Sequence, residues 1–128
     1  MIGRLVILLT LLGTGPLAAA PFIGEGGIAV TPQERGFSVA EDGGMGSRGY
    51  WCAAADFAIS RLGADGTERL YVLEPRQGRA GPVVFTLDPQ GLTPAPVFFT
   101  RNSVTVKGAT LTLSHARSFC HDFRIINR

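Results

Sequence analysis

Two cysteines, Cys52 and Cys120, constrain this chain of 128 residues more than any other feature. Two thiols allow a single intramolecular disulfide. A bond between positions so far apart would stabilise the fold by roughly 4 kcal/mol in the chain-entropy model. The alternative is a free catalytic thiol at Cys120 beside His121, but adjacent residues of a strand point to opposite faces and are poor partners for proton transfer. We therefore predict a Cys52–Cys120 disulfide, provided that the chain meets an oxidising compartment.

The N-terminal segment indicates such a compartment. Residues 1–20 read MIGRLVILLTLLGTGPLAAA, with one arginine, a short apolar core, a Gly/Pro break and three alanines. This layout is typical of a secretory signal peptide. The apolar core is too short for a membrane anchor, since a span takes roughly 20 apolar residues. We expect cleavage after residue 19 or 20, no stable membrane span afterwards, and one small exported domain over residues 21–128, periplasmic or extracellular.

Composition supports one folded domain and argues against some classes of function. The chain is 45% hydrophobic and 17% charged, and disorder of the whole chain requires the opposite balance. Its net charge is +2, and its basic residues form no dense cluster. The sequence therefore does not indicate nucleic-acid binding. The 17 glycines and 8 prolines are typical of a fold rich in strands and loops.

Apolar periodicity predicts one helix followed by strands. Over about residues 50–62, apolar side chains recur on one helical stripe that includes Trp51 and Cys52. A second, partly apolar face predicts that this helix is covered on two sides. Short apolar or alternating segments predict strands, at residues 28–30, 37–40, 68–73, 82–87, 97–100, 104–113 and 119–126.

These elements predict the α+β class. We expect one helix packed on an antiparallel sheet of about five or six strands. Lys107-Gly108 would form a hairpin turn within the segment 104–113, with glycine supplying the positive φ. The disulfide would then join the helix to the last strand, residues 119–126.

The glycine-rich segment before the helix is a candidate ligand site. Residues 44–49, GMGSRG, match G-x-G-x-x-G, but no parallel strand–helix–strand unit follows, so the motif does not indicate a dinucleotide. Backbone N–H groups at a helix start, with an arginine beside them, favour a small anion such as sulfate, phosphate or a sugar acid. The alternative is a flexible entry loop shaped by glycine. The candidate ligand-binding residues are Gly46, Ser47, Arg48 and Tyr50.

A second polar cluster lies in residues 114–122, SHARSFCHD. A hydrolase needs a nucleophile, a base and an orienting acid that converge in space. His115, His121 and Asp122 could contribute to such a group, but no G-x-S-x-G motif accompanies them. A metal site needs at least three ligands, and none is evident beyond the two histidines. The sequence thus indicates neither a metal nor a cofactor.

Phe98 and Phe99 are adjacent in a proline-rich setting. A strand would turn one ring to each face, and an exposed ring would favour a protein contact. No motif indicates a known family or a catalytic constellation, and the sequence does not indicate an oligomeric state. It favours a non-enzymatic binding or structural protein of the cell envelope, with an envelope or secreted protein as its partner. The alternatives are a small-anion or small-ligand binder at the glycine-rich loop, and a small hydrolase that uses the region of His115, His121 and Asp122.

Overall fold

A mixed sheet of seven strands forms one layer of the structure, a computed structural model that describes residue 3 and residues 20–126. The predicted signal peptide, residues 1–20, lies almost wholly outside the described residues. The strand order is β1-β2-β3-β5-β4-β7-β6. Neighbouring strands are antiparallel except β6 and β7, which run parallel. The strands are β1 (Phe22–Ile23), β2 (Ala29–Gln33), β3 (Gly36–Val39), β4 (Arg69–Glu74), β5 (Val83–Thr86), β6 (Ala95–Pro96) and β7 (Ala109–Thr112).

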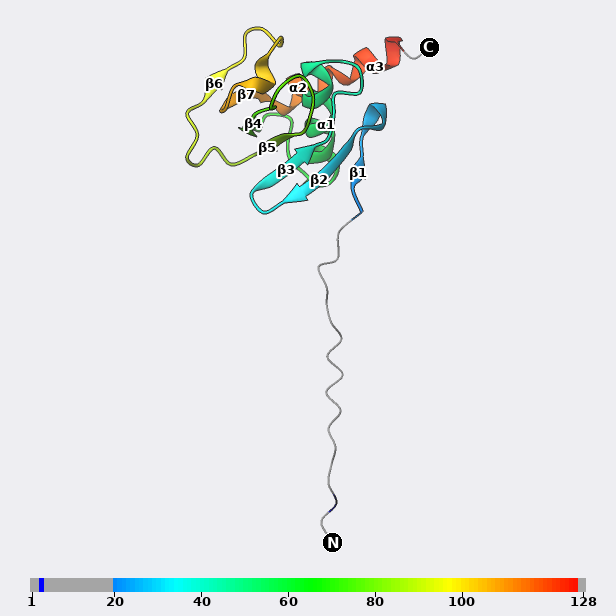
Figure 1. The fold of residues 1–128 in the computed structure, drawn as a ribbon, viewed down its shortest axis with the longest axis vertical. Coiled ribbons are helices and arrows are strands. Elements are labelled where there is room, and N and C mark those ends of the chain that lie inside the picture. Colours follow the sequence, from blue (N-terminus) through cyan, green and yellow to red (C-terminus); the bar gives the residue numbers. More distant parts are fainter. Residues whose placement is uncertain (1–2, 4–19, 127–128) are drawn as a thin grey trace.

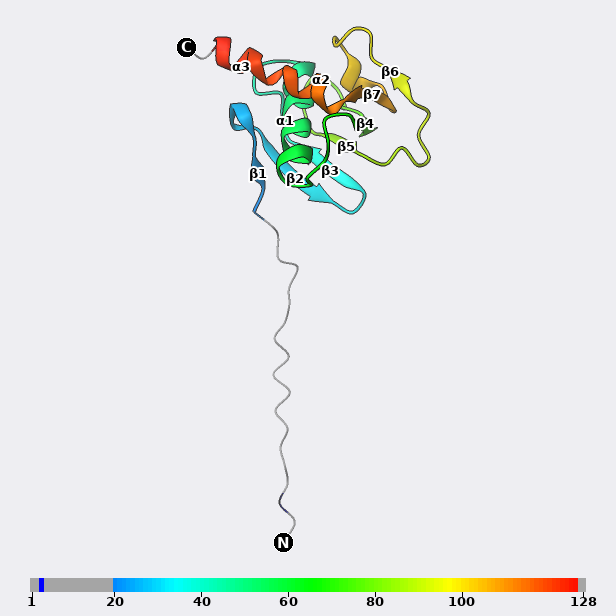
Figure 2. The same cartoon turned by 180° about the vertical axis from the view of Figure 1, so that it is seen from behind.

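The helices cover one side of this sheet in two layers (Figures 1 and 2). Helix α1 (Ser47–Ser60) packs on the sheet. Helices α2 (Leu113–Ser118) and α3 (Cys120–Ile126) pass across the side of α1 that faces away from the sheet. Residues 49–58 of α1 are all buried. The helix is therefore covered on two sides, as its second apolar face predicted. Two 3-10 turns, Glu25–Gly27 and Ser103–Thr105, complete the fold.

The structure confirms both the α+β class and the disulfide. Cys52 of α1 and Cys120 of α3 are bonded, with Cα atoms 5.0 Å apart although the residues are 68 positions apart in the chain. Both side chains are buried. The bond fixes the C-terminal helices against the central helix, and such a structural disulfide is typical of an oxidising compartment.

The prediction of an extended last strand over residues 119–126 is wrong, because this segment is helical. The structure has three α-helices in its described part, and the disulfide joins α1 to α3 rather than to a strand. The physical reason is an apolar stripe at spacings of three and four, which turns toward α1. Its buried members are Leu113, Ala116, Cys120 and Phe123. The Thr112 hydroxyl caps α2 by accepting the N–H of His115 at 3.2 Å.

The predicted hairpin at Lys107-Gly108 is also wrong. Val104 lies in a 3-10 turn and not in a strand, so no hairpin forms. On the side of β7 away from β4, the neighbouring strand is the parallel β6. The sheet is consequently mixed, with more strands than expected. Gly108 does have a positive φ of 86°, but close approach explains the glycine: a Cβ there would clash with the carbonyl oxygen of Thr93. Helix α1 also begins and ends slightly earlier than the predicted residues 50–62.

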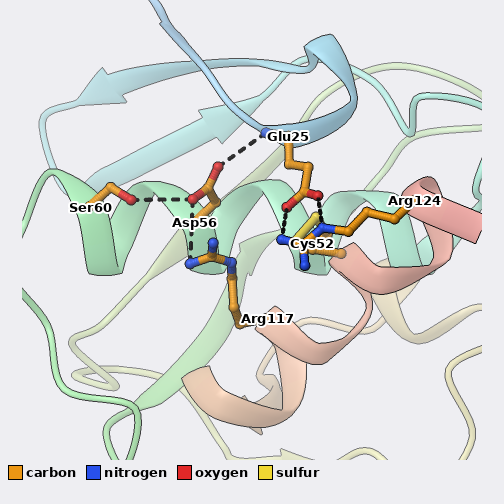
Figure 3. Close-up of polar contacts among 7 residues, drawn as sticks. Glu25, Cys52, Asp56, Ser60, Arg117 and Arg124 are labelled. Atoms are coloured by element: carbon orange, nitrogen blue, oxygen red, sulfur yellow. Dashed lines mark hydrogen bonds and ion pairs between the residues drawn. A yellow bond between two sulfur atoms is a disulfide. The ribbon is translucent and has the colours of Figure 1, made fainter. Parts of the chain in front are cut away.

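A buried carboxylate on α1 holds both ends of the domain against this helix (Figure 3). Asp56 accepts the backbone N–H of Glu25 at 3.1 Å and the hydroxyl of Ser60 at 3.2 Å. Arg117 of α2 lies 3.5 Å from the same carboxylate. The side chain of Glu25 pairs in turn with Arg124 of α3 at 2.7 Å. Because a buried charge is costly unless it is paired, these contacts fix the N-terminal segment and the C-terminal helices beside the disulfide.

Candidate binding surface

Two adjacent phenylalanines are the most exposed large apolar side chains in the described part of the chain. Phe98 and Phe99 are 87% and 85% exposed. They follow β6 after one intervening residue, Val97, and the chain bends at Phe98. The predicted strand over residues 97–100 is therefore wrong, and the bend explains why both rings face water instead of one turning inward.

A hollow of about 330 Å³ adjoins the two rings. Its wall is mostly apolar and belongs to β6, the start of β7 and the segment between them. Val106, which is 47% exposed, is the third exposed large apolar side chain at this hollow. We call Phe98, Phe99, Val106 and this hollow the aromatic surface. It lies at the β6 end of the sheet, opposite β1 (Figure 1).

Buried hydrogen bonds hold the segment that carries the two rings. Trp51 of α1 is fully buried and donates its indole N–H to the Ser103 hydroxyl oxygen at 2.8 Å. Ser103 donates its own hydroxyl to the carbonyl of Thr100 at 2.7 Å. On the other side of the rings, the N–H of Val97 donates to Thr110 of β7 at 3.2 Å. The segment is thus tied on both sides of the phenylalanines, and such preorganisation lowers the entropic cost of binding.

A second hollow, of about 310 Å³, lies on the other side of Arg101 and Asn102, which line both hollows. We call it the arginine hollow, because Arg48, Arg76 and Arg101 all line it. Arg48 pairs with Asp122 at 3.2 Å and lies over the ring of Phe119. Its remaining lining residues are Met45, Gly46, Ser47, Thr100 and Asn102.

The structure brings together three of the four residues predicted to bind an anion. Gly46, Ser47 and Arg48 line the arginine hollow, whereas Tyr50 does not. The Tyr50 side chain is buried and donates its hydroxyl to the Gly81 carbonyl at 2.6 Å. Burial, the largest effect, raises the pKa of this phenol above its usual value, although the nearby arginine at position 76 acts in the opposite direction.

Sequence reasoning missed Arg76 and Arg101. Both lie in loops, after β4 and after β6 respectively, and reach the start of α1 only through the sheet topology. No short motif joins them to Arg48. No local signal was available for this meeting, because β6 runs antiparallel to β4 and the two strands therefore end at opposite ends of the sheet.

The residues of the hydrolase hypothesis do not form a hydrogen-bonded group in the described structure. Asp122 pairs with Arg48, while the ring of His115 packs beside Phe119 with centroids 5.3 Å apart. His121 is exposed on α3. Within residue 3 and residues 20–126, no three His, Cys, Asp or Glu side chains are grouped so that they could hold a metal ion.

No protein-family model, curated protein or solved structure matches this chain. Of the helices in the described ranges, none is long and apolar enough to cross a bilayer. The class defined by the structure is an α+β domain with a mixed sheet, a doubly covered central helix and one buried disulfide.

Proposed function

We propose that this chain is an exported, non-enzymatic binding domain of the cell envelope, which contacts a protein partner through the aromatic surface. The observation that carries the proposal is the exposure of Phe98 and Phe99 on a segment that hydrogen bonds hold in place. Burying one phenylalanine contributes about 1.5–3 kcal/mol. Two such rings at a partner's surface could therefore supply a large share of a binding free energy, and aromatic anchors of this kind dominate many interfaces.

Charge argues for a partner of different sequence rather than a second copy of this chain. Arg101 lines the aromatic surface, and no aspartate or glutamate lines it in the described structure. A two-fold contact would bring the same patch of each copy together, and so would place arginine near arginine. A partner segment with apolar side chains and a carboxylate complements the rings and Arg101 together.

Two observations support an exported location. The buried Cys52–Cys120 bond is typical of oxidising compartments, and residues 1–20 have the layout of a signal peptide. Fractionation of cells that express the full chain, followed by intact mass of the product, tests the location. We expect an oxidised protein outside the cytoplasm that begins at residue 20 or 21. A full-length, reduced protein in the cytoplasm would contradict the proposal.

A double substitution, Phe98→Ser with Phe99→Ser, tests the contact surface. The wild-type domain is coupled to a resin, a retained envelope protein is identified, and its binding is then measured with purified components. We expect the double variant to bind at least a hundredfold more weakly, because it loses roughly 3–6 kcal/mol of apolar burial. Its stability should change by no more than about 0.5 kcal/mol per site, since exposed side chains contribute little to folding.

The matched control is Leu62→Ser, which removes another exposed apolar side chain that does not line the aromatic surface. This variant should bind like the wild type. A partner that binds the double phenylalanine variant with unchanged affinity would overturn the assignment of the surface. Light scattering over a range of concentrations tests for self-association. If the wild type forms dimers and the double substitution dissociates them, a second copy of this chain covers the aromatic surface instead.

A further inference from the structure

We propose that the arginine hollow is a binding site for a small, multiply charged oxyanion of the phosphate or sulfate class. This inference uses neither Phe98 nor Phe99, although Arg101 lines both hollows. The sequence pointed only to the start of the helix. The structure adds two further cationic side chains to that place, and these carry the inference.

Three arginines from separate parts of the chain line one hollow. Arg48 belongs to the first turn of α1, Arg76 follows β4 and Arg101 follows β6. Arg76 is held in place, since its backbone N–H donates to the Val104 carbonyl at 2.9 Å and its Nε donates to the Gly78 carbonyl at 3.1 Å. The same guanidinium lies close to the phenol of Tyr50, so a ligand would contact Arg76 alongside these protein groups.

The charged side chains that line the hollow are all basic. No aspartate or glutamate lines it in the described structure, and Asp122 compensates Arg48 alone, at 3.2 Å. Asp42, also near the start of α1, accepts the backbone N–H of Gly44 at 2.7 Å. Three like charges facing one space repel each other, and an anion with two negative charges would relieve that repulsion.

The chemistry of the lining favours an oxyanion over an apolar ligand. Guanidinium groups donate paired hydrogen bonds that match the oxygens of phosphate and sulfate. Ser47, Thr100 and Asn102 add hydroxyl and amide groups at the same hollow. The first turn of α1 carries no acidic residue, and its N-cap makes no side-chain hydrogen bond, so the helix start adds no competing carboxylate.

Calorimetric titration of the mature, oxidised domain with inorganic phosphate, and separately with sulfate, tests the site at low ionic strength. We expect saturable binding of one anion, weakened at least tenfold by Arg101→Gln and by Arg76→Gln. The matched control is Arg79→Gln, which removes an exposed arginine that does not line the hollow. It changes the net charge equally and should leave the affinity unchanged. Acetate, with one charge, should bind more weakly than phosphate.

A substitution that should strengthen binding complements these variants. Asp122→Asn removes the carboxylate that competes for Arg48, so it should strengthen phosphate binding several-fold. The proposal is overturned if the wild type binds neither anion, or if Arg79→Gln weakens binding as much as Arg101→Gln does, since net charge alone would then explain the effect. Circular dichroism of each variant shows that it is folded. Because the phenylalanines are unchanged throughout, failure here leaves the proposed protein contact standing.

Discussion

Replacing both cysteines, Cys52→Ala with Cys120→Ala, should lower the free energy of unfolding by about 4 kcal/mol. The bond joins residues 68 positions apart, and the chain-entropy model gives a loop of this length a closure term of about 4 kcal/mol at 25 °C. Both side chains are buried, so loss of the two sulfur atoms removes packing as well. In a domain of this length, such a loss lowers the melting temperature by roughly 15–20 °C.

Urea unfolding followed by tryptophan fluorescence measures this difference. Trp51 is the sole tryptophan of the chain, and it is buried next to Cys52 in the core, so its emission reports loss of the fold. Adding a reductant to the wild type should reproduce the loss, while the cysteine-free variant should not respond to it. A difference below about 1 kcal/mol between wild type and variant would refute the reasoning. The polar contacts of Asp56 would then suffice to fix the C-terminal helices.

Two further predictions follow from single residues of α1. Gly49→Ala should destabilise the domain by about 1–3 kcal/mol by overpacking, because a Cβ here would clash with the backbone carbonyl of Asp42. Alanine in a helix is ordinarily about 1 kcal/mol more favourable than glycine, so a stabilised variant in urea unfolding would contradict this. For Tyr50, burial raises the pKa of the phenol in the folded state, while the unfolded phenol loses its proton near pH 10, about the ordinary value. The contribution of Tyr50 to stability is therefore present below that pH and is lost as pH rises above it. Tyr50→Phe should reduce this alkaline loss while costing the hydrogen bond to Gly81 at neutral pH, and an unchanged slope of stability against pH would count against the assignment.

The sequence predicted those parts of the fold whose signal is local. The run of apolar residues around Trp51 is long enough to identify α1, and the pair of cysteines identified the disulfide without knowledge of any contact. The C-terminal helices were missed because β7 runs directly into α2. The apolar spacing of three and four becomes visible only when residues 113–123 are taken as one segment, instead of a polar cluster followed by a separate strand. Thr112, the helix cap at this junction, was the available signal of the change.

The candidate surfaces could be predicted only in part, because their geometry depends on contacts between distant positions. Phe98 and Phe99 both face water since the chain bends after β6, and the bend is supported by a hydrogen bond between Trp51 and Ser103, 52 positions apart. A contact between residues so far apart in the chain cannot be predicted from a local sequence pattern. The glycine-rich loop was detectable as a candidate anion site, but its additional arginines come from other loops.

The support beneath Phe98 and Phe99 distinguishes a binding surface from a loosely packed loop. An exposed aromatic pair on an untethered segment could turn inward and bury its area against the domain, at little cost in backbone order. Here Trp51 and Ser103 use their polar groups to fix the segment, and no buried polar side-chain atom in the described structure is left without a partner. Turning the rings inward would break these bonds, at about 1–3 kcal/mol for each buried group left unsatisfied. Loss of both bonds would thus cost about 2–6 kcal/mol, which is comparable to the gain of about 3–6 kcal/mol from burying both rings. Turning inward therefore brings no clear net gain, and the rings stay available for a contact outside the domain.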